Sequence, residues 1–248
     1  MLLRAREVSM AFDGFVAVDG ASLEVAAGEI IGLIGPNGAG KSTFFNCLAG
    51  DLAPHAGMVL FDDVDVTRAS PETHARLGIG RTFQVPATFQ EMTLLENVMV
   101  GAFLRRPRER EARAEAQRVL DLTGLAELAH HKAGSLGTPG RKRLEIARVL
   151  AASPRLMLLD EALAGLTATE VRQAIELVRS IHRMGVTLVI VEHVMEVILT
   201  LAQRIVVFNQ GRVIAHGAPD KIVNDAAVID AYLGHAHARR ASHAARSG

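Results

Sequence analysis

Nine consecutive residues carry a pattern that suits the binding of phosphate. They match the spacing G-x-x-x-x-G-K-[ST] and read Gly35-Pro36-Asn37-Gly38-Ala39-Gly40-Lys41-Ser42-Thr43. The glycines let successive backbone N–H groups turn toward one anion, and the lysine adds a full positive charge. A hydroxyl directly after the lysine can coordinate Mg²⁺. The pattern therefore predicts a site for a nucleoside triphosphate, with Ser42 as a magnesium ligand.

The residues on either side of this loop decide whether it is more than a glycine-rich turn. The apolar run Ile30–Ile34 before it is short and β-branched, as in a buried parallel strand. After it, apolar residues fall at helical spacing, namely Phe44, Phe45, Cys47 and Leu48. A helix beginning at the loop places the positive end of its dipole beside the phosphates. This arrangement favours phosphate binding over a chance Lys-Ser pair.

A second apolar run ends in two carboxylates. Leu156–Leu159 reads as a buried strand, and Asp160 and Glu161 follow it directly. Ligands of α/β proteins bind at the carboxyl ends of strands, so Asp160 is predicted to hold Mg²⁺. Glu161, one residue further, is placed to take a proton from an attacking water. The alternative reading is a helix N-cap, and the upstream phosphate loop makes it the weaker one.

The composition limits the classes of partner. The chain has 248 residues and a formal net charge of zero, whereas nucleic-acid-binding proteins usually carry a basic field. Its one cysteine, Cys47, is expected to be a small core residue. Met1–Arg4 leads directly into charged sequence, and no stretch reaches the ~18 apolar residues of a membrane span. We therefore predict a cytoplasmic protein without a nucleic-acid partner, whose membrane role depends on another subunit.

The order of predicted elements indicates an α/β fold. Short alternating segments near Leu2–Val8, Ala21–Val25 and Gly57–Phe61 predict an N-terminal antiparallel β layer. A helical insertion is expected over about 91–153, beginning with a Thr93/Glu96 capping box. The charge run Arg105–Arg118 within it reads as a solvated helix face.

The second half of the chain predicts a mostly parallel sheet. Buried strands are expected at Leu156–Leu159, Thr187–Val191 and Arg204–Phe208, and a helix opened by a Thr167/Glu170 capping box separates the first two. A strand, a helix and a strand in this order imply parallel pairing. A hairpin is expected at Asn209-Gln210-Gly211. Residues 235–248 have almost nothing to bury and are expected to be disordered.

Taken together, these motifs resemble the ATP-binding subunits of ABC transporters over residues 1–234. The segment Arg81-Thr82-Phe83-Gln84 is similar to the family's Q-loop, and Val191-Glu192-His193 is similar to its switch histidine. Each is weak alone, and their joint order carries the likeness. The resemblance implies an α/β P-loop NTPase (RecA-like) core that binds ATP and Mg²⁺. Gln84 would then lie near Mg²⁺ and the attacking water, His193 would hydrogen-bond the γ-phosphate, and Phe12 would stack on adenine.

A narrower resemblance is to the branched-chain amino-acid uptake branch. It rests on Leu144-Glu145-Ile146-Ala147-Arg148, on Ala164-Gly165-Leu166, and on Ala231-Tyr232-Leu233-Gly234 near the end. The likeness implies a second ABC ATPase subunit, identical or different, together with transmembrane permease subunits and a solute-binding protein. It also implies a location at the cytoplasmic face of the membrane. ATPases of lipopolysaccharide or lipid export share part of the pattern and remain an alternative.

An apolar series around Gln84 predicts the surface that meets the permease. We expect its side chains to be exposed and to receive a short cytoplasmic helix of the membrane subunit. The members are Phe83, Val85, Phe89, Met92 and Leu94.

The sequence departs from the family where its signature Leu-Ser-Gly-Gly-Gln is expected. Those positions read Leu136-Gly137-Thr138-Pro139-Gly140, so the serine hydroxyl and one backbone N–H are missing. We expect Thr138 to be the N-cap and Pro139 the first residue of a helix. Ala162 and Thr167 replace a usual proline and a usual Asp or Asn.

The hypothesis drawn from the sequence is an ATPase that drives a membrane transporter as a head-to-tail dimer. One rival is a soluble ABC ATPase of DNA repair, chromosome structure or translation, but the long coiled coils or zinc modules of such chains are not evident here. A second rival binds ATP as a clamp and barely turns it over. Loss of Glu161 or His193 would mark such a clamp, and both residues are present.

Overall fold

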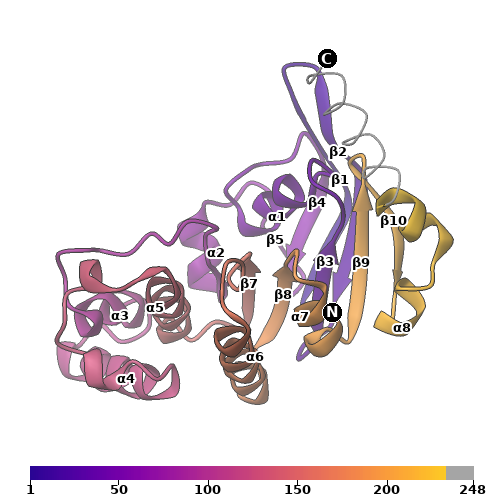
Figure 1. Ribbon diagram of the computed structural model, residues 1–248. Coiled ribbons are helices and arrows are strands. Elements are labelled where there is room, and N and C mark those ends of the chain that lie inside the picture. The colour runs from indigo at the N-terminus through magenta and orange to yellow at the C-terminus, as the bar shows by residue number, and fades with distance from the viewer. Residues whose placement is uncertain (233–248) are drawn as a thin grey trace. The chain divides into compact units, whose positions relative to one another are not determined.

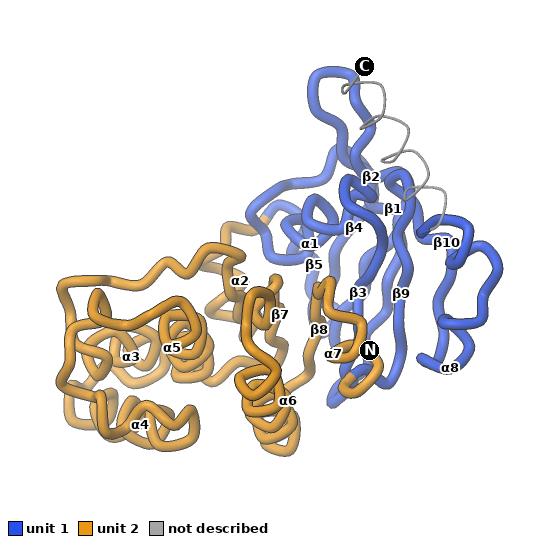
Figure 2. The backbone as a smooth tube through the Cα atoms, viewed as in Figure 1, with its two compact units in different colours: residues 1–68, 202–248 blue, residues 69–201 orange. Residues whose placement is uncertain are grey.

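The computed structural model describes residues 1–232, so the tail predicted to be disordered at 235–248 lies outside the described residues. Most of its elements are labelled in Figure 1. The described residues form two compact units, 1–68 with 202–232 and 69–201 (Figure 2). No helix in the described part of the chain is long and apolar enough to cross a membrane.

The first unit contains the predicted N-terminal antiparallel sheet. Its strands are β1 (Leu3–Phe12), β2 (Phe15–Val25), β4 (Ala56–Phe61) and β5 (Val64–Asp65), in the order β2-β1-β4-β5. Strands β1 and β2 form a hairpin with Phe12 opposite Phe15 at its tip. The three strands predicted near this end are confirmed, and β1 and β2 are longer than predicted because the hairpin continues beyond the alternating segments.

The same unit holds the strand and helix that flank the phosphate loop. Strand β3 (Ile30–Ile34) is buried along its whole length and pairs in parallel with β9 (Arg204–Asn209). The predicted hairpin is present, because β9 turns through Gln210 and Gly211, both with positive φ, into antiparallel β10 (Arg212–Gly217). Helix α1 (Lys41–Ala49) follows the loop, and α8 (Pro219–Ile222) follows β10.

The second unit is built on three parallel strands. Strand β7 (Leu156–Asp160) pairs with β6 (Ile79–Arg81) on one side and with β8 (Thr187–Val191) on the other. Helix α6 (Ala168–Arg183) connects β7 to β8, while α2 (Pro71–Leu77) precedes β6 and α7 (Met195–Leu201) follows β8. The predicted Thr167/Glu170 capping box opens α6, whose buried stripe is Val171, Ile175, Val178 and Ile181.

The remaining helices of this unit fall within the predicted insertion. They are α3 (Leu94–Ala102), α4 (Glu109–Leu122), the short turns η1 (Ala126–Leu128) and η2 (Ala133–Ser135), and α5 (Thr138–Ala151). Helix α3 contacts both α4 and α5 and begins with the predicted Thr93/Glu96 capping box. That the insertion is a separate subdomain with bounds near 91 and 153 stays a prediction.

Candidate functional site

The phosphate loop connects β3 to α1 and is closely packed at two glycines. A Cβ on Gly35 would lie 2.1 Å from the backbone oxygen of Phe208, and one on Gly40 would lie 2.3 Å from that of Ala17. Both glycines also have positive φ, 149° and 98°. Because a side chain at either position would collide with a neighbouring strand, the loop can take this path only with glycine. The resulting backbone cradle fits a phosphate group.

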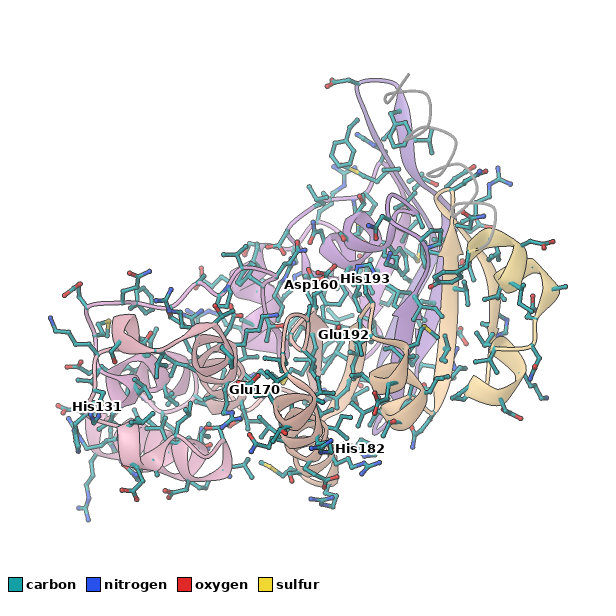
Figure 3. All side chains as sticks on the ribbon, viewed as in Figure 1. His131, Asp160, Glu170, His182, Glu192 and His193 are labelled. Carbon is teal, nitrogen blue, oxygen red and sulfur yellow. The ribbon has the colours of Figure 1, made fainter. Side chains whose placement is uncertain are left out.

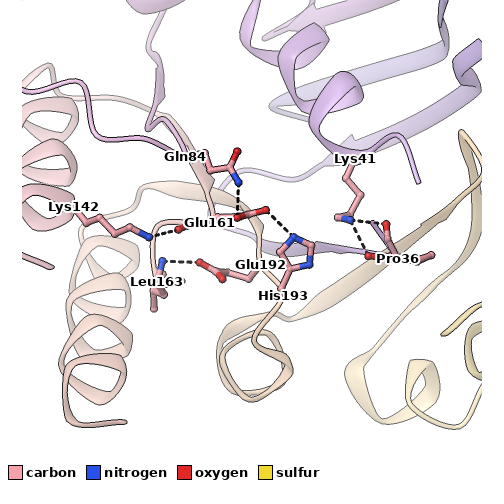
Figure 4. A network of polar contacts seen from close by, with 9 residues as sticks. Pro36, Lys41, Gln84, Lys142, Glu161, Leu163, Glu192 and His193 are labelled. Atoms are coloured by element: carbon pink, nitrogen blue, oxygen red, sulfur yellow. Dashed lines mark hydrogen bonds and ion pairs between the residues drawn. The ribbon is translucent and has the colours of Figure 1, made fainter. Parts of the chain in front are cut away.

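Lys41 is the first residue of α1, and its side chain is buried. Its Nζ donates hydrogen bonds to the backbone oxygens of Gly35 at 2.8 Å and Pro36 at 3.0 Å (Figure 4). The ammonium group therefore lies against the loop, at the end of the helix where the dipole is positive. Ser42, the next residue, is exposed, so its hydroxyl is accessible to a ligand.

Phe12 and Cys47, in the same unit, differ in exposure. Phe12 ends β1 with 43 % of its surface exposed, which leaves the ring free to stack on a planar group. Cys47 is buried in α1, and burial raises the pKa of its thiol to about 11. The thiol is therefore a neutral core group at physiological pH, as expected from the sequence.

The second unit brings Gln84, Glu161 and His193 into one hydrogen-bonded cluster. The amide Nε2 of Gln84 donates to one carboxylate oxygen of Glu161 at 2.9 Å, and Nε2 of His193 lies 2.7 Å from the other (Figure 4). Gln84 follows β6, Glu161 follows β7, and His193 follows β8. Because the strands are parallel, their carboxyl ends meet at one edge, and each carries one member of the cluster.

Asp160 is the last residue of β7 and is buried beside Arg81. The Arg81 guanidinium lies 3.4 Å from a carboxylate oxygen of Asp160. The backbone N–H of Asp160 donates a hydrogen bond to the hydroxyl of Thr82. Burial raises the pKa of the Asp160 carboxyl, while the Arg81 charge lowers it. Figure 3 shows Asp160 and His193 near each other at this edge. A buried carboxylate of this kind suits a cation ligand.

The backbone at Glu161 is held in a conformation that non-glycine residues rarely take, with φ of 46°. Its N–H donates to the Val191 oxygen at 2.9 Å, and its oxygen accepts from Nζ of Lys142 at 2.8 Å. Left-handed backbone costs on the order of 1 kcal/mol and persists where surrounding contacts hold it. Sequence reasoning missed Lys142, although a lysine within the apolar face of a helix was a signal that could have drawn attention to it.

Helix α5, which begins where the sequence differs from the family signature, starts one residue earlier than predicted. Gly137 is the N-cap of α5, with extended φ and ψ of −67° and 170°, and Thr138 is already helical. The prediction that Thr138 is the N-cap is therefore wrong, and no side chain caps this helix. Pro139 lies in the first turn, where its missing N–H costs nothing.

The apolar series around Gln84 is exposed only in part. Phe83, Val85 and Phe89 are exposed, and Met92 is half-buried. Leu94 is wrongly included, because it is the first residue of α3 and lies fully buried in the helical core. Arginine side chains lie over two of the exposed rings, Arg81 over Phe83 and Arg148 over Phe89.

Comparison with known families identifies the family of the chain. Residues 18–164, more than half of the chain, match the family model described as ABC transporter. The chain belongs to this family and is an ABC ATPase. Residues 212–238 match a second model, described as branched-chain amino acid ATP-binding cassette transporter.

Two curated relatives show to which branch of the ABC transporter family the chain belongs. The chain is 39 % identical over 251 residues to the high-affinity branched-chain amino acid transport ATP-binding protein LivG of Escherichia coli K12, with 95 % of this chain and 98 % of LivG covered. The corresponding protein BraF of Pseudomonas aeruginosa is 38 % identical over 253 residues, covering 95 % of this chain and 98 % of BraF. The chain is thus a member of the LivG/BraF family of ABC transporter ATP-binding proteins.

Solved structures share the fold. The ADP conformation of an ATP-binding cassette from an ABC transporter superposes with a TM-score of 0.86 at 32 % identity, covering 94 % of this chain and 98 % of that one. A dimeric cassette bound to ADP and Pi in a post-hydrolysis state gives 0.80 at 25 % identity, with 88 % and 98 % covered. The predicted fold class, an α/β P-loop NTPase with an N-terminal antiparallel sheet, is confirmed.

Proposed function

We propose that this chain hydrolyses ATP to power the uptake of branched-chain amino acids or closely related solutes. The observation that carries the hydrolytic part is the carboxylate of Glu161 held between Gln84 and His193. Membership of the LivG/BraF family supports the transport part. The identity of the transported solute is inferred from this family membership.

We assign the nucleotide contacts of the first unit from the phosphate loop. Lys41 and the backbone amides of 38–43 would bind the phosphates, and the exposed ring of Phe12 would stack on adenine. Ser42 is proposed as a ligand of Mg²⁺ in the first unit, and Gln84 and Asp160 are the ligands proposed in the second. Bound Mg²⁺ supplies positive charge that offsets the charge developing on the phosphoryl oxygens. The exposed hydroxyl of Ser42 and the buried carboxylate of Asp160 are hard oxygen donors, which suit this ion.

We assign Glu161 as the general base for hydrolysis. Its carboxylate would accept a proton from water as the water oxygen attacks the γ-phosphorus and the bond to the leaving ADP oxygen breaks. The hydrogen bonds from Gln84 and His193 fix the carboxylate in one orientation. His193, with an exposed imidazole, would also hydrogen-bond the γ-phosphate.

We propose that the working assembly is a head-to-tail dimer of cassettes at the cytoplasmic face of the membrane. The dimeric structure of a cassette bound to ADP and Pi supports the pairing of two cassettes. The second ATPase subunit is either identical or different. Permease subunits would dock on the exposed rings beside Gln84, and a solute-binding protein would deliver the solute to them.

The test is reconstitution of this chain in liposomes with its permease subunits, its second ATPase and its binding protein. We expect ATP-driven uptake of labelled leucine, isoleucine or valine, and ATPase activity that rises when the loaded binding protein is added. Lys41→Ala should abolish both activities. Stimulation by a lipid or lipopolysaccharide in place of amino acids would contradict the proposed solute and support the export alternative. ATP binding without measurable turnover in the full assembly would support the clamp.

A further inference from the structure

A buried lysine that the proposed reaction does not use contacts the catalytic loop. Lys142 lies in α5, with 9 % of its surface exposed. Its Nζ donates to the backbone oxygen of Glu161 at 2.8 Å (Figure 4) and to that of Ala164 at 2.7 Å. A charged donor shared by two carbonyls in a buried place forms stronger hydrogen bonds than a neutral one. The contact therefore joins α5 to the loop over residues 161–164.

A second buried side chain, that of Glu192, holds the same loop from another element. Glu192, with 1 % of its surface exposed, accepts a hydrogen bond from the backbone N–H of Leu163 at 2.7 Å. The backbone oxygen of Glu161 accepts a further bond from Ala164 N–H at 3.2 Å. The loop is thus held through its oxygens by α5 and through an N–H by the segment after β8. Main-chain atoms carry these contacts, so the identity of the loop side chains does not decide them.

We propose that Lys142 is a positioning residue for ATP hydrolysis, because it fixes the backbone of the 161–164 loop and thereby the direction of the Glu161 carboxylate. The inference rests on the proposed role of Glu161 as the base. The carboxylate starts from a backbone with φ of 46°, which external contacts must maintain. Loss of the ammonium would let the loop relax and displace the carboxylate. A displacement of about 1 Å in a catalytic group can lower the rate about 100-fold.

The experiment measures steady-state ATPase activity of the assembled transporter with Lys142→Met in this chain. Methionine keeps much of the side-chain volume and removes the donor and the charge. We expect kcat to fall about 10- to 100-fold, with KM for ATP and binding of a fluorescent ATP analogue within about twofold of wild type. The matched control is Lys132→Met, which removes an exposed lysine of the same unit paired with Glu91 and should leave kcat unchanged. An unchanged kcat in Lys142→Met overturns the proposal.

Combination with Glu161→Gln separates positioning from general structural support. If Lys142 acts through the Glu161 carboxylate, Lys142→Met should cause no further loss in single-turnover rate once Glu161 is Gln. A further loss of similar size in the double variant would show that Lys142 supports the fold instead, and would overturn the proposal. Near wild-type turnover in Glu161→Gln alone would contradict the assignment of Glu161 as the base. The Lys142 variants do not test that assignment, so failure of the base and failure of the positioning role give different results.

Circular dichroism melting shows whether each variant is folded. If Lys142→Met does not fold, Lys142→Gln takes its place, because its amide retains a neutral donor. We then expect a smaller fall in kcat that again vanishes in the Glu161→Gln background. A wild-type kcat, or a loss that persists in that background, would overturn the proposal.

Discussion

The imidazole nitrogen Nε2 of His193 lies 2.7 Å from a carboxylate oxygen of Glu161, although the residues are 32 positions apart. The contact exists because β7 and β8 are adjacent parallel strands with Asp160 opposite Val191. Each of the two side chains lies just beyond that last pair. The hydrogen bond holds one carboxylate oxygen of the proposed base, while Gln84 holds the other.

Replacement of Glu161 by Gln tests the base directly. The amide has nearly the same volume and can still bond to Gln84 and His193, but it cannot accept a proton from water. We expect kcat to fall about 10²- to 10⁴-fold with ATP affinity retained, as measured by phosphate release and nucleotide binding. Glu170→Gln is the control, since Glu170 is the capping-box residue of α6 and glutamine can take its place there. A turnover near that of wild type in Glu161→Gln would refute the assignment.

Replacement of Phe89 by Asp tests the surface proposed to meet the permease. Phe89 is 46 % exposed and lies under the guanidinium of Arg148, so the change places a charge on an accessible apolar surface. We expect solute uptake to be lost with ATP affinity unchanged. Phe103→Asp changes an equally exposed ring of the same unit and should leave uptake intact. Equal uptake by Phe89→Asp and Phe103→Asp would contradict the assignment of Phe89 to the docking surface.

The altered signature at residues 136–140 predicts that the two ATP sites of a head-to-tail dimer differ in activity. Each phosphate loop of such a dimer is completed by the signature of the other subunit, and this chain lacks the serine at Gly137. If the second subunit carries a full signature, Lys41→Ala in this chain should remove most turnover. The corresponding change in the second subunit should matter less. Equal losses in the two one-sided variants of a reconstituted heterodimer would contradict the asymmetry.

The same asymmetry predicts the effect of restoring the hydroxyl. Gly137 has ordinary φ, and a Cβ there would meet nothing closer than 3.9 Å, so Gly137→Ser should fold normally. A serine at the N-cap of α5 should also raise the free energy of unfolding by a few tenths of a kcal/mol. We expect turnover at the second subunit's site to rise, measured with Lys41→Ala in this chain. No rise would indicate that the hydroxyl is not the limiting contact.

Substitution of Gly35 tests the packing of the phosphate loop. Gly35→Ala places a methyl 2.1 Å from the Phe208 backbone oxygen, whereas Gly14→Ala has positive φ but nothing within 4 Å. Both variants carry the conformational cost of a left-handed residue. Gly35→Ala should be less stable by about a further 1–3 kcal/mol in urea unfolding. Equal stabilities would show that the loop moves freely away from β9.

The buried carboxyl of Glu192 predicts a pH dependence of stability. Burial raises the pKa of this group in the folded chain, and the N–H of Leu163 lowers it by less. A carboxyl with a raised pKa binds more protons when folded than when unfolded. The contribution of this carboxyl to the free energy of unfolding should therefore fall as pH rises from the ordinary pKa of about 4.3 to the raised value.

Glu192→Gln removes this titration and keeps an oxygen that can accept from Leu163. Between those pKa values, the stability of the variant relative to wild type should increase with pH, as measured by urea unfolding at several pH values. Glu127→Gln, on the exposed η1 turn, should show no such trend. A constant difference between wild type and Glu192→Gln would contradict the prediction.

Local rules failed where tertiary packing decided the outcome. Threonine and glycine are about equally favoured as N-caps, so local preference does not choose between Thr138 and Gly137, and the chain enters α5 through Gly137 in an extended conformation. Leu94 resembles its exposed neighbours in polarity, but its place at the start of α3 directs it into the helical core. Neither position can be settled from a short stretch of sequence, because both depend on the packing of neighbouring segments.

Short stretches of sequence were enough to predict the phosphate loop, the strand that ends at Asp160 with Glu161 directly after it, and the capping boxes of α3 and α6. Each of these is specified by residues within a few positions of one another, through backbone conformation and helix-end hydrogen bonds. The folded chain was needed to show that Gln84 and His193 share the Glu161 carboxylate, from sequence separations of 77 and 32, and that Lys142 holds the loop behind it. Those contacts depend on which strands are neighbours and on how α5 packs, and no local spacing encodes either.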